Sequence, residues 1–372
     1  MIRKLSILDR SRTREGHPAP EALRDTVELA RAAERLGYHR FWVSEHHSVP
    51  GVAGSAPTVL AAAVAGATGR IRVGTGGVML PNHQPLVVAE QFGVLESLFP
   101  GRIDMGLGRS VGFTGGIRRA LGRGTGDADR FEEQLAELLG WLDGTQRAHR
   151  EVHARPAEGL RIPPYVLATG EGAGIAARAG LPLVVGDLRA RARVVEIIEG
   201  YREEFRPSPW GAEPYVIASG TVAVAATPEA ARRILIPEAW ALARSRTRGS
   251  FPPLRPAEEI EALTMTPKER ELYEGALAGH VHGTEEQVAA ELSAVAELTG
   301  ADELLVTTST YDRTALLDSF GRLARLARLT GLTDHTGPAD SRAPNAPGPV
   351  QLRDAVWNPA EAQEPAGLAK SP

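Results

Sequence analysis

The chain has 372 residues, of which 42% are hydrophobic and 24% are charged, with a formal net charge of −4 and no cysteine. This length can bury a large core, and the mixed charges lack the basic stripe expected of a nucleic-acid-binding protein. Without cysteine there is no disulfide, thiolate nucleophile or cysteine-ligated metal. The N-terminal apolar run is too short for a secretory signal, and no stretch is long enough to span a membrane, so we expect a soluble cytoplasmic protein.

Apolar runs of strand length alternate with amphipathic segments of helix length. The predicted strands are residues 4–8, 40–44, 71–77, 102–108, 164–169, 181–186, 215–225 and 303–308. The predicted helices are residues 20–37, 56–69, 85–99, 129–144, 172–180, 191–205, 228–245, 284–300 and 312–331. Several of these helices end at glycine, as a left-handed C-cap requires.

Eight nearly continuous apolar strands separated by helices predict a parallel sheet covered by helices. A closed (β/α)8 barrel and a doubly wound open sheet both satisfy this pattern. The count of eight favours the α/β barrel, whose functional groups lie at the C-terminal ends of the strands. A dinucleotide-binding open sheet needs a glycine-rich fingerprint after the first strand, and "SILDRSRTREG" does not supply one.

Two segments fall outside the alternation of strands and helices. Residues 247–281, which contain "GSFPPLRP" near their start, predict an insertion after the seventh strand unit. We expect this insertion to act as a lid at the mouth of the active site. Residues 331–372 are rich in Pro, Ala and Gly and predict a tail without a core of its own. The barrel domain is therefore expected to span residues 1–330.

The stretch "WVSEHHSVPG" places Glu45, His46 and His47 directly after the second predicted strand. A neutral imidazole at that position can accept a proton near neutral pH. In isolation, such a pair can equally serve only to hydrogen-bond its loop. A metal site is a weaker reading, because no HxxxH or Cys/His spacing accompanies the pair.

Glycines mark the end of the third predicted strand, at Gly74, Gly76 and Gly77. Glycine weakens a strand and often leaves open space above the backbone, where a flat ligand can approach. The alternative is a bulge or a tight corner of the barrel.

The fourth and fifth predicted strands each end in a candidate anion-binding feature. Arg109 follows "RIDMGLG" and is suited to bidentate phosphate recognition, although a surface ion pair is an equal alternative. Thr169 and Gly170 open the turn "ATGEG" before a helix, where backbone N–H groups can hold an anion. A plain left-handed turn would also explain this glycine-rich sequence.

Together these pieces resemble the bacterial-luciferase-like flavin monooxygenases. The resemblance spans most of residues 4–328 and is most specific in EHH (45–47), GGVMLPNH (76–83) and PGRIDMGLGR (100–109). It implies a (β/α)8 barrel that takes reduced FMN from a separate flavin reductase. It further implies that the flavin reacts with O2 at C4a, giving a (hydro)peroxide that oxygenates a small organic substrate, for instance in secondary metabolism. Dimers formed through barrel-side helices are also implied.

Site residues carry over from the family position by position. The resemblance implies a catalytic imidazole at His46 and cofactor-binding roles for Gly76, Gly77, Arg109, Thr169 and Gly170. No metal site is expected, because the ligand spacing for one is missing. The two adjacent glycines match a non-proline cis peptide beneath the isoalloxazine. The arginine and the turn after the fifth strand match the groups that bind the FMN phosphate.

The chain departs from the family pattern twice. Many relatives have Gly-Ser-Ser-like hydroxyls where this chain reads "ATGEG", which implies weaker phosphate binding, and "SVGFTGG" replaces Ala-Pro-Gly-Thr-Asp after Arg109, which leaves substrate choice open. Two alternative functions remain. One is an F420-dependent oxidoreductase that transfers hydride without O2. The other is a non-catalytic flavin-binding subunit, against which the presence of His46 and Arg109 argues.

Overall fold

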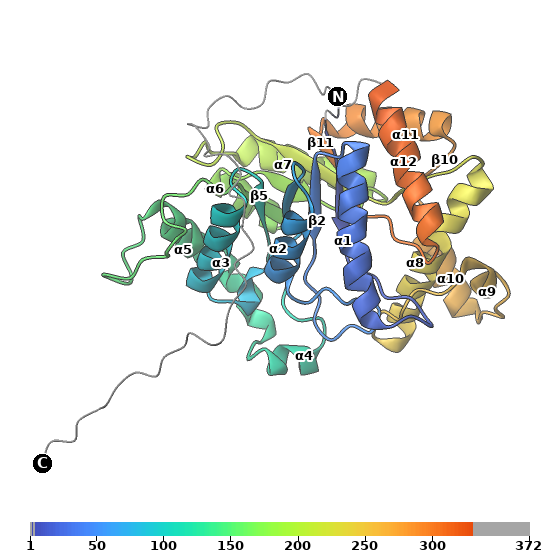
Figure 1. Ribbon diagram of the computed structural model, residues 1–372, viewed down its shortest axis with the longest axis horizontal. Coiled ribbons are helices and arrows are strands. Elements are labelled where there is room, and N and C mark those ends of the chain that lie inside the picture. The colour runs from blue at the N-terminus through green and yellow to red at the C-terminus, as the bar shows by residue number, and fades with distance from the viewer. Residues whose placement is uncertain (1, 3, 330–372) are drawn as a thin grey trace, which may run out of the picture. The chain divides into compact units, whose positions relative to one another are not determined.

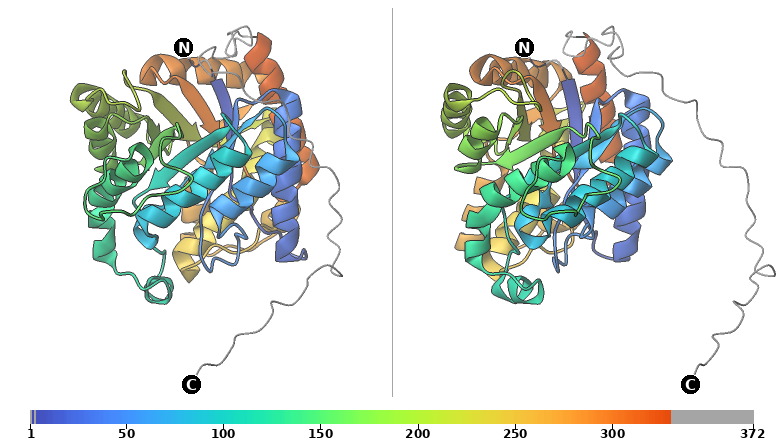
Figure 2. Two further views of the ribbon diagram at one scale, coloured as in Figure 1. Left: turned by 60° about the vertical axis from the view of Figure 1, so that its left-hand side comes forward. Right: turned by 90° about the vertical axis from the view of Figure 1, so that its left-hand side faces the viewer.

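The computed structural model describes residue 2 and residues 4–329, so the predicted tail at 331–372 lies outside the described residues. Parallel strands form a central barrel that helices surround (Figure 1, Figure 2). The barrel strands are β1 (Lys4–Asp9), β2 (Arg40–Val43), β3 (Arg72–Thr75) with its continuation β4 (Val78–Met79), β5 (Ile103–Gly108), β6 (Pro164–Ala168), β7 (Leu183–Val185), β8 (Val216–Gly220) and β11 (Glu303–Val306).

Strand pairing closes the sheet on itself. The order runs β3-β2-β1-β11-β8-β7-β6-β5, and β3 then pairs with β5, with every pairing parallel. Because the ring has eight positions and no free edge, the predicted (β/α)8 barrel is confirmed. Its C-terminal strand ends all open at one face.

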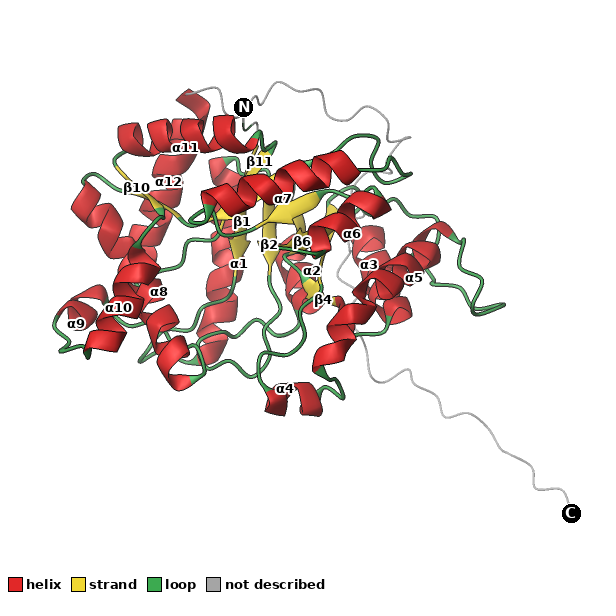
Figure 3. Cartoon of the chain, turned by 180° about the vertical axis from the view of Figure 1, so that it is seen from behind, coloured by secondary structure: helices red, strands yellow, loops and turns green. Residues whose placement is uncertain are grey.

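Helices cover the outside of the barrel (Figure 3). They are α1 (Ala19–Leu36), α2 (Pro57–Ala67), α3 (Pro85–Leu98), α5 (Phe131–Asp143), α6 (Gly172–Ala179), α7 (Arg191–Glu204), α8 (Pro228–Arg248), α11 (Glu285–Thr299) and α12 (Arg313–Leu329). In α1, buried Ala22, Leu29 and Ala33 face the barrel, and the helix ends at Gly37 with φ 84°. Such a left-handed C-cap suits glycine because it has no Cβ. No helix within the described ranges is long and apolar enough to cross a membrane.

The predicted strand 215–225 is two strands. β8 stays in the barrel, whereas β9 (Val222–Val224) leaves it and pairs with β10 (Val281–Gly283) outside. The prediction of one strand was wrong because the apolar run continues through the break between β8 and β9. The strand β10 was not predicted, and it begins at the end of the 247–281 segment.

The 247–281 segment contains two helices, α9 (Ala257–Glu261) and α10 (Pro267–Leu277), which pack with α8 (Figure 1). Their buried apolar residues join α8 in a small core of their own, which includes Ile234, Trp240, Ile260 and Tyr273. Further short elements between β3 and α5 are η1 (Leu80–Asn82), α4 (Gly115–Ala120) and η2 (Thr125–Arg130).

Aromatic and aliphatic side chains fill the inside of the barrel, among them Trp42, Tyr165, Ile217 and Leu305. Trp42 Nε1 donates to Asp104 Oδ2 at 3.0 Å, which satisfies the buried indole N–H. The barrel is therefore a packed core, and ligands are restricted to its open C-terminal face.

A buried ion network lies at the N-terminal strand ends of the barrel. Arg40 Nε donates to Glu303 Oε1 at 2.8 Å, and Arg40 Nη1 donates to Asp104 Oδ2 at 2.9 Å. The side chains of Asp104 and Glu303 are fully buried. Paired in this way, the buried charges compensate one another and close this end of the barrel.

Candidate active site

A cavity of about 710 Å³ opens at the C-terminal ends of β2, β3 and β5. It brings together four of the six residues proposed for the site, His46, Gly76, Gly77 and Arg109. Thr169 and Gly170 do not line this cavity, although they follow the neighbouring strand β6. The volume is in the range of small-molecule and cofactor sites.

Glu45 is the centre of a hydrogen-bond cluster in the wall of the cavity. Its side chain is fully buried and accepts hydrogen bonds from His47 Nε2 at 2.7 Å, His83 Nε2 at 3.0 Å and the Met79 N–H at 2.9 Å. Burial alone would raise the pKa of Glu45, but the hydrogen bonds from His83, Met79 and His47 outweigh it and lower the pKa. Glu45 is therefore an ionised anchor that fixes two imidazoles.

His46 is arranged differently from its neighbour. Its backbone N–H donates to Gly54 O at 2.9 Å, and its ring Nδ1 lies 3.2 Å from Ser44 Oγ. Among the described residues, no hydrogen-bond partner is found for Nε2. This ring nitrogen is thus the one available for proton exchange in the cavity.

Burial, together with the charges of Arg10 and Arg12, lowers the pKa of His46 to about 4. Glu238, on α8, holds both arginines in place, with Oε1 3.1 Å from Arg10 Nη1 and Oε2 3.1 Å from Arg12 Nε. The imidazole of His46 is consequently neutral at pH 7 and can act as a proton acceptor.

The peptide bond between Gly76 and Gly77 is cis, as the family resemblance implied. Both glycines line the cavity. The direction in which a Cβ would point is occupied for each glycine, so only the backbone faces the cavity. A Cβ on Gly76 would lie 2.6 Å from Leu8 Cδ1, and a Cβ on Gly77 would lie 2.8 Å from Gly106 O. A side chain on Gly77 would meet the backbone of β5, and one on Gly76 would have to displace the end of the Leu8 side chain.

The same close approach explains Gly74, where a Cβ would lie 2.5 Å from Asp104 O. The Thr75 hydroxyl donates to Gly106 O at 2.7 Å across the same pair of strands. These glycines form the tight corner of the barrel that was the alternative reading of the pattern.

Arg109, at the end of β5, forms ion pairs with two acidic residues. Its Nη1 lies 2.5 Å from Glu171 Oε2, and its Nη2 lies 3.5 Å from Asp129 Oδ1. Glu171 belongs to the turn after β6, so Arg109 does lie beside the predicted phosphate-binding turn. Arg109 thus forms the surface ion pair that the sequence offered as the alternative to phosphate binding. Phosphate binding by Arg109 stays a prediction.

The turn after β6 leads directly into α6. Thr169 is exposed, and its carbonyl accepts a weak hydrogen bond of 3.5 Å from Arg193 Nη2. The Ala173 N–H donates to Gly170 O at 2.9 Å, which starts the helix. Two guanidinium groups, those of Arg109 and Arg193, thus flank the N-terminal end of α6, where an anion is stabilised by the helix dipole.

Two phenylalanines from distant segments meet at the cavity. The rings of Phe113, before α4, and Phe251, in the 247–281 segment, have centroids 6.0 Å apart. Together with Val49, Met79 and Leu167 they give the cavity an apolar wall.

Backbone hydrogen bonds attach the start of the 247–281 segment to the barrel. The Gly51 N–H donates to Phe251 O, the Leu254 N–H donates to Thr13 O, and the Glu15 N–H donates to Leu254 O. Gly51 is in close contact there, because a Cβ would lie 2.1 Å from Pro252 O. This part of the segment is a fixed wall of the cavity in the structure.

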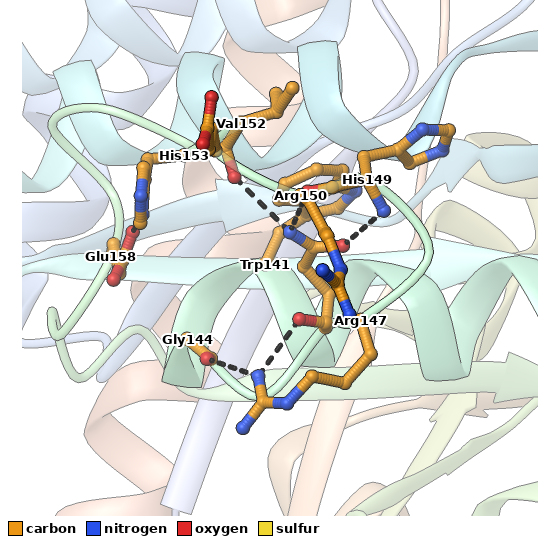
Figure 4. A pocket seen from close by; sticks show the side chains of 10 residues that line it. Trp141, Gly144, Arg147, His149, Arg150, Val152, His153 and Glu158 are labelled. Carbon is orange, nitrogen blue, oxygen red and sulfur yellow. Dashed lines mark hydrogen bonds and ion pairs between the residues drawn. The ribbon is translucent and has the colours of Figure 1, made fainter.

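A second hollow, of about 480 Å³, lies between the end of α5 and the loop before β6 (Figure 4). The rings of Trp141 and His149 stack in its wall with centroids 5.9 Å apart, and His153 Nδ1 lies 2.6 Å from Glu158 Oε2. Because the loop precedes β6, this hollow is at the N-terminal end of the barrel. It contains none of the predicted site residues.

Sequence reasoning missed several residues of the site. His83 falls within the specific GGVMLPNH element, whose histidine was a usable signal. Glu171 falls within the quoted "ATGEG" turn. Phe113 and Phe251 gave no signal, because their contact joins segments more than a hundred residues apart. No group of three or more His, Asp or Glu side chains suited to a metal is found in the described part of the chain.

Comparison with known proteins places the chain in one family. The model of the luciferase-like monooxygenase family matches residues 3–303. The chain is 38% identical to the protein YvbT of Bacillus subtilis (strain 168) over 86% of this chain and 95% of that one. It is 36% identical to a luciferase-like monooxygenase of Escherichia coli (strain K12), over 85% and 94% of the two chains. The crystal structure of apo-MsnO8 is similar with a TM-score of 0.78 and 32% identity, over 88% and 98%.

Proposed function

Because this chain belongs to the luciferase-like monooxygenase family, we propose that it is an FMN-dependent monooxygenase that uses reduced FMN and O2 to oxygenate a small organic substrate. One observation carries the proposal. A single cavity at the C-terminal face of the barrel collects a neutral imidazole, two adjacent glycines and a guanidinium group. In barrels of this kind that face is where catalysis takes place.

The residues present fit FMN. Gly76 and Gly77 present bare backbone to the cavity, so a flat ring can lie against them. Arg109, Thr169, Gly170 and the start of α6 would hold the phosphate, because a guanidinium group and a helix N-terminus both favour a dianion. Bound FMN would supply the electrons that reduce O2, a reaction for which no side chain of the chain is suited.

His46 would manage the proton in this reaction. With Nδ1 bonded to Ser44 Oγ, the free Nε2 takes a proton from the substrate or returns one to it. The low pKa keeps the His46 ring neutral at pH 7, so the ring can accept a proton there. Glu45 does not act on the substrate, because its oxygens are committed to His47, His83 and Met79.

The apolar wall favours a substrate with an apolar or aromatic body. Phe113 and Phe251 would contact that body and exclude water from the reacting atoms, which limits wasteful loss of reducing equivalents to solvent. The 247–281 segment remains our candidate for the lid. Its start is a fixed wall, so any closing movement would have to come from its later part or from the loop that carries Phe113.

We also propose that a separate flavin reductase supplies the reduced cofactor and that the protein is a homodimer. Both follow from the family resemblance. Turnover that requires an added reductase, and a dimer mass by light scattering, would support them.

The decisive experiment is reconstitution with FMN, a flavin reductase, NADH and 18O2, with a panel of apolar and aromatic metabolites as substrates. Incorporation of one 18O atom into a product would support the proposal. Hydride transfer from reduced F420 without O2 uptake would replace it with the F420-dependent function. Flavin binding without turnover of either kind across a broad panel would favour the non-catalytic subunit.

A further inference from the structure

Arg109, the residue best placed to bind the flavin phosphate, is bonded to a carboxylate of the chain itself. Glu171 Oε2 lies 2.5 Å from Arg109 Nη1, and both side chains reach solvent, with exposures of 83% and 29%. Glu171 is the residue immediately before α6, yet its side chain makes no capping hydrogen bond to that helix. Within the part of the chain that the structure describes, the ion pair with Arg109 is the one polar contact found for the Glu171 side chain.

The stem of Arg109 also lies against the turn after β6. A Cβ on Gly172 would be 3.7 Å from Arg109 Cδ, so the guanidinium group and the first residues of α6 form one surface. A phosphate that binds both ends of this guanidinium group would have to displace Glu171 from Nη1, and Asp129, at 3.5 Å, from Nη2. The closer of these two ion pairs, with Glu171, is thus the first contact that such a phosphate would have to break.

We propose that Glu171 competes with the flavin phosphate for Arg109 and thereby weakens the preference of the protein for FMN over riboflavin. The inference rests on the proposed function, since it concerns the same cofactor site. Glu171 is a specificity-determining residue in this view, because it acts on the phosphate alone and not on the ring. A weak phosphate contact would also ease the exchange of flavin with a reductase.

Glu171→Gln tests the proposal, with dissociation constants measured by quenching of flavin fluorescence. Loss of the charge should tighten FMN binding about two- to sixfold, which is the range that an exposed ion pair can supply. Riboflavin has no phosphate, so its dissociation constant should change by less than about twofold. Equal tightening for both flavins, or none for FMN, would overturn the proposal.

Glu132→Gln is the matched control. It removes the same charge from the nearby surface, but Glu132 pairs with Arg178, at 3.0 Å, and not with Arg109. FMN binding should be unchanged in this variant. A gain equal to that of Glu171→Gln would show a general effect of net charge and overturn the proposal.

Competition also predicts coupling between the two residues. In an Arg109→Ala background, Glu171→Gln should change FMN binding by less than about twofold, because no guanidinium group remains to be freed. The full gain in that background would mean direct repulsion and would overturn competition. Failure of both flavins to bind the parent protein and all variants would instead defeat the proposed function itself.

Discussion

Glu45 Oε1 accepts a hydrogen bond from His47 Nε2 at 2.7 Å, whereas the adjacent His46 makes no such contact with Glu45. Two consecutive histidines thus have different chemistry. His47 is anchored to an ionised carboxylate, and His46 keeps one ring nitrogen free in the cavity. The sequence pair alone could not distinguish these roles, because alternation along an extended loop sends neighbouring side chains in different directions.

This division predicts that His46→Ala loses about 10²- to 10⁴-fold in substrate oxygenation, the usual contribution of a general acid or base. Flavin binding should remain, since His46 is not among the groups proposed to hold the phosphate. His47→Ala is the matched control and should lose less than about tenfold. Steady-state product formation checks both variants, and unchanged turnover in His46→Ala would refute its role.

Stability should fall as the pH drops from 7 to 5, in part because of His39. Burial, assisted by the charge of Arg40, lowers the pKa of His39 to about 4. The unfolded chain, with a histidine pKa near 6.5, therefore binds more protons than the folded protein between pH 6.5 and pH 4. The contribution of neutral His39 to the free energy of unfolding is therefore fully present above this pH window and is lost as the pH falls through it. For one histidine the loss at pH 5 is about 2 kcal/mol.

Urea unfolding at several pH values measures this effect. His39→Gln should reduce the loss between pH 7 and pH 5, while the loss from His46, whose pKa is also about 4, remains. A pH profile that is identical in parent and variant would show that His39 does not titrate as described.

Much of the fold was predictable because the barrel strands are short apolar runs separated by amphipathic helices. The exception at β9 has a physical cause. Val222 and Val224 are as apolar as the strand before them, and only their pairing with β10 takes them out of the barrel. Local pattern carries no information about that distant partner.

The buried ion network was also beyond the sequence. Arg40, Asp104 and Glu303 each stand at or near the start of a strand, where a charged residue looks like a solvated flank. They meet because closure of the barrel brings β2, β5 and β11 around one axis, with partners 64 and 263 residues apart. The candidate site was more predictable, because its residues fall in specific short motifs at strand ends.

Arg109→Ala should weaken FMN binding more than riboflavin binding, because only FMN has a phosphate to lose the guanidinium contact. The expected loss for FMN is modest, about three- to tenfold, since Glu171 already competes for Arg109 in the parent protein. Fluorescence titration with both flavins measures the difference. Equal losses for the two ligands would show that Arg109 supports the ring or the fold and not the phosphate.

Phe113→Ala should impair the binding of apolar substrates more than the chemical step. The Phe113 side chain is 58% exposed at the cavity, so its removal leaves no hole in a packed core and should leave the melting temperature unchanged. It does remove apolar surface that a bound substrate would cover, which corresponds to about 1–2 kcal/mol and therefore to roughly a five- to thirtyfold rise in KM. Because this contact is made equally in the ground state and the transition state, kcat should change little.

Phe113→Leu, which keeps most of the apolar surface, should restore much of the affinity. A fall in kcat with an unchanged KM would contradict a substrate-binding role and would point to closure of the cavity as the function of Phe113.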